Sequence, residues 1–167
     1  IYSIFYAESY RNRYAEFLKM DFPRIPITSN NMLFRELSSL GERLVKLHLM
    51  EITLSLLTEY QSQGDNKVER IKYIPEIRMN SKSSIQIFGR VYINNHQFFA
   101  GIPEEVWNFK IGGYQVCHKW LKDRKGRVLS QADIDHYQQI VAILSETISL
   151  MDKIDGVIEE NGGWPLS

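Results

Sequence analysis

Positive charge is concentrated in one short stretch of the sequence, YQVCHKWLKDRKGRVL, which runs from Tyr114 to Leu129. Five lysines and arginines lie within residues 119–127, and Asp123 is the only acidic residue among them. Lysine and arginine neutralise phosphate groups, and the arginine fork also hydrogen-bonds the edge of guanine. The stretch is therefore a candidate nucleic-acid contact. A second interpretation stays open, in which this is a solvated loop whose charges pair with the acidic residues that follow, Asp133, Asp135 and Glu146.

Motifs for catalysis are missing from the sequence. It has no phosphate-binding GK[ST] loop, no HExxH, no GxSxG and no paired cysteines, and without a Pro-Pro pair it lacks the signature of an amino-methylating DNA methyltransferase. Asp123-Arg124-Lys125 matches the D-x-K half of a nuclease motif, but a tripeptide occurs often by chance. The four histidines do not fall at metal-ligand spacing. We expect no catalytic residue and no metal ligand in this chain.

The charge is distributed unevenly along the chain although its formal net charge is zero. Residues 1–66 carry 7 basic and 8 acidic groups, residues 67–127 carry 12 and 5, and residues 128–167 carry 1 and 7. A basic middle region can attract a polyanion. With 167 residues, 44% of them hydrophobic, and a single cysteine, the sequence predicts one soluble domain in a reducing, cytoplasmic setting. Its apolar start without Met suggests a piece of a larger protein.

Periodicity predicts the elements that must position this charge. Apolar residues at helical spacing indicate helices over residues 9–23 and 32–60, so that residues 1–60 form a helical part. One side of the second helix carries Leu33, Leu37, Leu40, Leu44 and Leu47. Residues 67–111 read as about four short, largely antiparallel strands, with Pro75 at an edge or irregularity. Ser130 and Asp133 resemble a capping box that starts a helix over residues 131–154, within a C-terminal region at 130–155. The predicted fold class is α+β: N-terminal helices, a small mostly antiparallel sheet and a long C-terminal helix.

Residues 112–127 are predicted to form a basic helix and loop. Tyr114, Cys117, Trp120 and Leu121 fall at helical spacing and would bury one side, while lysines project from the other. Basic residues interleave with Trp107, Phe109, Tyr114 and Trp120, and we favour core positions for these aromatic residues over base stacking. The predicted structural residues are Gly112, Gly113, Tyr114, Trp120 and Gly126, with Trp120 buried and a tight turn at Gly126.

Three longer phrases carry a family resemblance: SYRNRYAEFLKMDFPRIPIT, GIPEEVWNFKIGG and IGGYQVCHKWLKDRKGRVLSQADIDHYQQIVAILSETISLMDKID. They resemble the C-terminal specificity domain of Type ISP restriction-modification enzymes and related adenine methyltransferase and helicase polypeptides. The resemblance implies a single target-recognition domain, residues 1–167, at the end of a large bacterial, cytoplasmic polypeptide. It implies that the chain binds duplex DNA, with no membrane partner, and positions the target for an N6-adenine methyltransferase domain of the same polypeptide. S-adenosylmethionine, ATP and Mg²⁺ would belong to the methyltransferase, translocase and nuclease domains, and none to this fragment.

Phosphate contacts position a protein on DNA, whereas groove contacts specify the sequence. The predicted phosphate-binding residues are Lys110, Lys119, Lys122, Arg124, Lys125 and Arg127. Specificity domains differ where they read different sequences, so the reading residues are expected in the less familiar region 66–99. The candidate base-reading residues are Arg78, Asn80, Lys82, Arg90, Asn94, Asn95 and Gln97. The alternative function is a protein-interaction module that clamps the methyltransferase domain and contacts DNA little.

Overall fold

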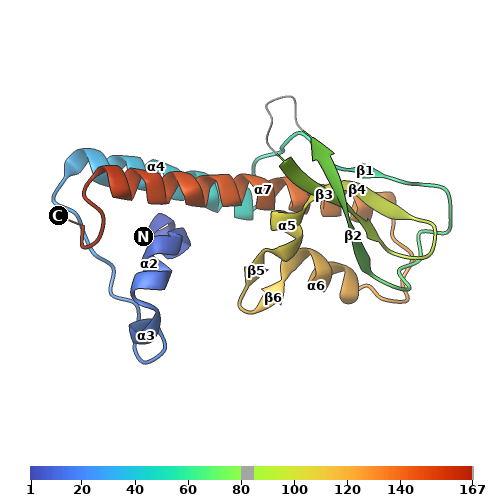
Figure 1. The fold of residues 1–167 in the computed structure, drawn as a ribbon, viewed down its shortest axis with the longest axis horizontal. Coiled ribbons are helices and arrows are strands. Elements are labelled where there is room, and N and C mark those ends of the chain that lie inside the picture. The colour runs from blue at the N-terminus through green and yellow to red at the C-terminus, as the bar shows by residue number, and fades with distance from the viewer. Residues whose placement is uncertain (80–84, 167) are drawn as a thin grey trace. The chain divides into compact units, whose positions relative to one another are not determined.

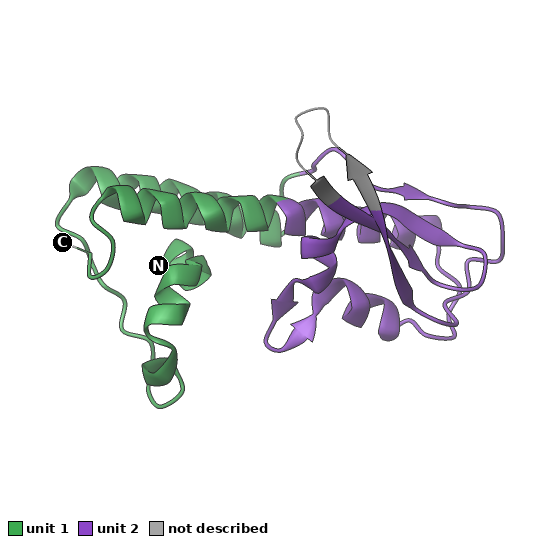
Figure 2. Cartoon of the chain, viewed as in Figure 1, with its two compact units in different colours: residues 1–52, 146–167 green, residues 53–145 purple. Residues whose placement is uncertain are grey.

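The computed structural model describes residues 1–79 and 85–166, and it contains helices and a small antiparallel sheet (Figure 1). The predicted α+β class is confirmed. The chain forms two compact units: unit 1 contains residues 1–52 and 146–167, and unit 2 contains residues 53–145 (Figure 2). None of the helices within the described residues is both long and apolar enough to span a membrane.

Unit 1 begins with three short helices, α1 (Tyr2–Tyr6), α2 (Glu8–Arg13) and α3 (Ala15–Leu18). The single helix predicted over residues 9–23 is therefore wrong. The backbone leaves helical geometry at Tyr14, with φ of −105° and ψ of 18°, and there the Tyr14 ring lies 5.0 Å from the Tyr10 ring and 6.2 Å from Trp164. Tertiary packing of these rings outweighs the local helical pattern.

Helix α4 (Asn31–His48) buries the leucine face that the sequence predicts, which consists of Leu33, Leu37, Leu40, Leu44 and Leu47. The Asn30 side chain caps it by accepting hydrogen bonds from the backbone N–H groups of Met32 and Leu33. The helix ends at His48, so the helix predicted to continue to residue 60 is wrong there. Met50 adopts a positive φ of 57°, which an α-helix cannot include.

Unit 2 is built on a four-stranded antiparallel sheet in the order β1-β4-β3-β2. The strands are β1 (Glu59–Tyr60), β2 (Lys72–Met79), β3 (Ile85–Tyr92) and β4 (Phe98–Pro103). Pro75 lies in β2, opposite Gly89, and β2 is an edge strand, as predicted. Helix α5 (Glu104–Asn108) follows β4 directly.

The two faces of this sheet differ. Val91, Phe99 and Ile102 are fully buried on the inner face. There Phe99 packs on Tyr137 with 4.5 Å between ring centroids, and Tyr73 stacks on Trp107 of α5 at 5.3 Å. Because side chains alternate along a strand, Lys72 and Ile74 face the opposite side, together with their partners Tyr92 and Arg90. The core therefore lies on one face, and the other carries charged and aromatic side chains.

After α5 the chain forms a hairpin of β5 (Lys110–Ile111) and β6 (Tyr114–Gln115), then α6 (Val116–Lys122) and the long α7 (Gln131–Glu160). The capping box is confirmed: Ser130 Oγ and N–H both donate to Asp133 Oδ2, at 2.7 and 3.0 Å, and Ser130 Oγ accepts from the Asp133 N–H at 3.2 Å. Helix α7 continues past the predicted end at residue 154 because Val157 and Ile158 extend its buried face.

Candidate nucleic-acid interface

A groove of about 500 Å³ lies between the β5–β6 hairpin and α6, and we call it the α6 groove. Three of the predicted phosphate-binding residues, Lys110, Lys119 and Lys122, line it. Its remaining lining residues are Gly113, Tyr114, Gln115, His118 and Asp123. Lys110 comes from β5 and the other two lysines from α6, so folding gathers cations that are up to twelve residues apart in the sequence.

The hairpin turn and the buried side of α6 hold this groove in shape. Gly112 and Gly113 have φ values of 57° and 84°, a conformation that favours glycine, and they return the chain so that Lys110 lies opposite Gln115. Cys117 and Leu121 are fully buried on one side of α6, which leaves Lys119 and Lys122 on the other. Burial raises the pKa of the Cys117 thiol to about 12. The thiol therefore stays protonated near neutral pH and acts as a core side chain.

Two aromatic residues lie differently from their predicted positions. Tyr114 was expected on the buried side of the basic helix, yet it is 63% exposed, because the glycine turn places it in β6 and α6 begins only at Val116. Trp120 is half-buried rather than buried, with its ring 5.2 Å from that of Tyr137. The prediction of a core position holds for Trp107, which is buried.

The Arg124 side chain contacts other residues of the same chain. Its guanidinium carbon lies 3.5 Å from the centroid of the Trp120 ring, and its Nη1 donates to the Trp120 carbonyl at 3.2 Å. Its Nε lies 3.5 Å from Asp133 Oδ1. The Ser130 hydrogen bonds, and then the Arg124 guanidinium, hold the pKa of Asp133 below its usual value. For Arg124 the structure thus shows the second interpretation of the basic stretch, pairing with the acidic helix.

The other predicted phosphate-binding residues divide into two groups. Lys119 forms an ion pair with Asp123, the acidic residue of the D-x-K tripeptide. Within residues 1–79 and 85–166, no ion pair involves Lys110, Lys122, Lys125 or Arg127. The loop that carries the last two turns at Gly126, which has a φ of 83° and donates its N–H to the Val68 carbonyl at 2.7 Å. Among the predicted phosphate-binding residues, these four are therefore the ones that no described carboxylate neutralises.

Among the candidate base readers, Asn94 and Gln97 belong to a buried network at the β3–β4 turn. Gln97 is fully buried: its Nε2 donates to Asn66 Oδ1 at 2.7 Å, and its Oε1 accepts from the Asn66 N–H at 2.8 Å. Asn94 is 9% exposed and donates to Gln97 Oε1 and to the Lys67 carbonyl, at 3.0 and 3.2 Å. Asn95, between them, is exposed. The network therefore fixes the turn that presents Asn95.

The remaining candidates lie along β2 and β3. Arg90 pairs with Glu76 at 2.7 Å, and its guanidinium carbon lies 4.8 Å from the centroid of the Phe98 ring. Arg78 is in β2, opposite Gln86, but its side chain is not described. Asn80 and Lys82 lie outside the described residues.

Two exposed cations that the sequence pattern does not distinguish, Arg70 and Lys72, line a second groove of about 200 Å³. We call it the β2 groove; its other lining residues are Ile74, Tyr92, Asn94 and Asn95. The composition of the 67–127 block indicated an excess of cations, but only the folded structure shows that these two line one groove with Tyr92. Within the part of the chain that the structure describes, no group of three His, Cys, Asp or Glu side chains could hold a metal ion.

The fold and its grooves define an α+β protein with basic grooves on unit 2. The chain belongs to the family of Type ISP C-terminal specificity domains, whose model matches residues 1–153. This confirms the resemblance carried by the three sequence phrases. No curated protein matches the sequence.

Three solved structures share the fold. A nuclease-deletion mutant of the Type ISP restriction-modification enzyme LlaGI, in complex with a DNA substrate mimic, is 20% identical with a TM-score of 0.62; the match covers 91% of this chain and 13% of that one. The ATP-dependent Type ISP enzyme LlaBIII bound to DNA is 17% identical with a TM-score of 0.64, covering 92% and 11%. The DrdV–DNA complex is 20% identical with a TM-score of 0.66, covering 91% and 17%. This chain thus spans 11–17% of the length of these proteins.

Proposed function

We propose that this chain recognises a short sequence in duplex DNA for a restriction-modification enzyme. The observation that carries the proposal is the α6 groove, which gathers three lysines in a member of the Type ISP specificity-domain family. The charge distribution supports it. Unit 2 contains twelve of the 20 lysines and arginines but only nine of the 20 acidic residues. The similar folds of LlaGI, LlaBIII and DrdV were solved with DNA or a DNA mimic.

In this proposal, Lys110, Lys122, Lys125 and Arg127 contact phosphates, because none of them is neutralised by an ion pair within the described residues. Lys119 adds to the local positive potential although it shares its charge with Asp123. Base reading falls to exposed side chains. Asn95 is one, since an amide can pair with adenine N6 and N7 in the major groove.

For Arg78, Asn80 and Lys82, base reading stays a prediction from the sequence. Arg90 is engaged by Glu76 and Phe98, so reading a base would require it to give up that ion pair. The buried Asn94 and Gln97 support the turn rather than reaching outward.

The second proposed partner is the adenine methyltransferase domain of the same polypeptide, for which this chain positions the target base. Unit 1 offers a surface suited to a protein, because five large apolar side chains are more than half exposed on residues 20–34. They are Met20, Phe22, Ile27, Met32 and Phe34. Exposed apolar side chains gathered in one segment are typical of an interaction site. S-adenosylmethionine, ATP and Mg²⁺ are assigned to other domains of the parent, and no residue of this chain is proposed to hold them.

DNA binding is tested by fluorescence anisotropy of the chain with a labelled, mixed-sequence duplex at several salt concentrations. Each neutralised phosphate contributes about 0.9 to the slope of log K against log salt, so four contacts predict a slope of at least about 3.6 in magnitude. No binding at about 50 mM salt would contradict the proposal and favour the protein-interaction alternative. Exchanging residues 66–99 with those of a relative of different specificity then tests whether that region reads the sequence.

A further inference from the structure

The β2 groove is built so that two cations point the same way. Arg70 lies two residues before the start of β2, Lys72 is the first residue of β2, and both side chains line this groove. Within the described residues neither forms an ion pair. Lys72 lies opposite Tyr92 in the β2–β3 register, and Tyr92 lines the same groove.

Hydrogen bonds fix the backbone that carries these cations. The N–H groups of Glu69 and Arg70 both donate to the Ile93 carbonyl, at 2.7 and 3.1 Å. Ile93 in turn donates its N–H to the Gln97 carbonyl at 3.0 Å and so closes the β3–β4 turn. The cations and Asn95 are therefore held by the same few backbone groups, which keeps their spacing constant.

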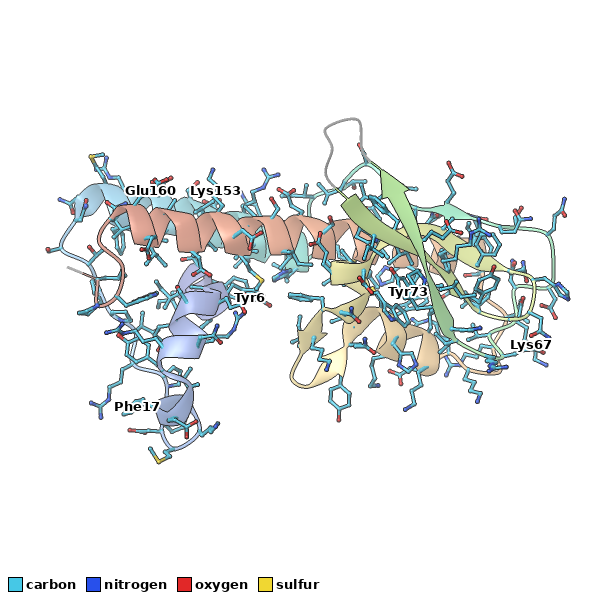
Figure 3. All side chains as sticks on the ribbon, in the orientation of Figure 1. Tyr6, Phe17, Lys67, Tyr73, Lys153 and Glu160 are labelled. Atoms are coloured by element: carbon cyan, nitrogen blue, oxygen red, sulfur yellow. The ribbon has the colours of Figure 1, made fainter. Side chains whose placement is uncertain are left out.

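This groove also adjoins the basic loop that follows α6. Val68 donates its N–H to the Arg127 carbonyl at 2.9 Å, and Lys67 pairs with Val128 in an isolated antiparallel bridge. Lys67 lies at the edge of unit 2 (Figure 3) and approaches Glu69 to 4.0 Å, so part of its charge is offset. The segment that carries Arg70 and Lys72 is thus paired through its backbone with the loop that carries Arg127.

We propose that Arg70 and Lys72 form a second phosphate-contact site for duplex DNA, beside the base-reading side chain of Asn95. This inference rests on the proposed function and adds to it two residues that the basic stretch at 119–127 does not contain. Phosphate contacts beside a reading side chain fix its register on the duplex. Arginine suits this position because its fork binds two phosphate oxygens, and lysine because it is a compact point charge.

The test compares the salt dependence of duplex binding by wild-type protein, by Arg70→Ala/Lys72→Ala and by a matched control. Loss of two phosphate contacts should reduce the magnitude of the slope by about 1.8. Between about 50 and 200 mM salt, the double variant should consequently lose about tenfold less affinity than the wild type loses. The control, Arg35→Ala/Lys153→Ala, removes one exposed arginine and one exposed lysine from unit 1 and should leave the slope unchanged.

Arg70→Lys/Lys72→Arg exchanges the two side chains while keeping both charges, and it should retain the wild-type slope. Circular dichroism of each variant confirms that it is folded. A wild-type slope in the folded double-alanine variant overturns the inference and leaves the proposed function standing. An equal loss of slope in the control overturns it as well, because the effect would then reflect net charge alone. If the wild-type protein does not bind, the proposed function fails and this site fails with it.

Discussion

Neighbouring residues in the loop after α6 should respond in opposite ways to the same change. Arg124 is 28% exposed and makes three contacts with its own protein: the Trp120 ring, the Trp120 carbonyl and Asp133. Lys125 is exposed and forms no ion pair with any described residue. Each substitution to alanine removes one positive charge, so the pair separates the structural role of a cation from its binding role.

The magnitudes follow from these contacts. A partly desolvated cation–π contact contributes about 1 kcal/mol, a hydrogen bond from a charged donor about 1.5–3 kcal/mol, and a partly exposed ion pair at most about 1 kcal/mol. Because one side chain makes all three contacts, the terms do not add, and we expect Arg124→Ala to cost about 1–3 kcal/mol. For a chain of this size that lowers Tm by about 3–10 °C. The salt slope of DNA binding should stay at its wild-type value.

Lys125→Ala should do the reverse. Its stability should remain within about 0.5 kcal/mol of the wild type, as for most surface substitutions, while the slope falls by about 0.9. Thermal unfolding followed by circular dichroism gives the first quantity, and anisotropy at several salt concentrations gives the second. If Arg124→Ala leaves Tm unchanged and lowers the slope by a full contact, the guanidinium faces phosphate and the reasoning is refuted.

Four other substitutions test the interface and the residues that support it. Gly126→Ala should cost about 1–2 kcal/mol in thermal unfolding, purely from the positive φ, because a methyl group there would meet no atom within 4 Å; an unchanged Tm would contradict this. Gln97→Ala should destabilise the protein by about 2–4 kcal/mol in denaturant unfolding, because it leaves buried hydrogen-bonding groups without their partner. Asn95→Ala should keep the wild-type stability and lose about 1–3 kcal/mol of discrimination between cognate and altered duplexes. Equal losses of stability would contradict the different roles assigned to the two residues. The pKa of Asp133 is lowered in the folded state, so its carboxylate contributes stability above about pH 4, the ordinary aspartate value, and that contribution is lost as the pH falls further. Asp133→Asn should therefore make the free energy of unfolding depend less on pH in the acid range. An unchanged dependence would show that the charge of Asp133 does not stabilise the capping box.

Local patterns were sufficient where a single element decides the outcome. The leucine spacing of α4, the capping box at Ser130 and the glycine turn at Gly126 each depend on residues within a few positions, and each was predicted from the sequence. The family resemblance was likewise carried by contiguous phrases and is confirmed over residues 1–153.

The sequence-based predictions were wrong where contacts between residues far apart in the sequence determine the structure. The sequence could not show that Tyr14 leaves its helix to pack on Trp164, 150 positions away, or that Met50 ends α4 in the left-handed region. The same limit applies to the site. Spacing alone could not show that the Arg124 side chain contacts the Trp120 ring. Gln97 was predicted to read bases from the surface, but the fold buries it.

The pairing of residues 66–68 with residues 126–129 has a cost for the free protein. It joins two segments, about sixty positions apart in the chain, that each carry one cation, Lys67 and Arg127, although Glu69 offsets part of the charge on Lys67. Like charges brought together by folding repel one another, and dissolved ions screen that repulsion. Added salt should therefore stabilise this junction in the free protein, whereas it should lower the affinity of the protein for DNA. If the proposed function is right, a bound duplex relieves the same repulsion and so stabilises the fold at this edge of unit 2.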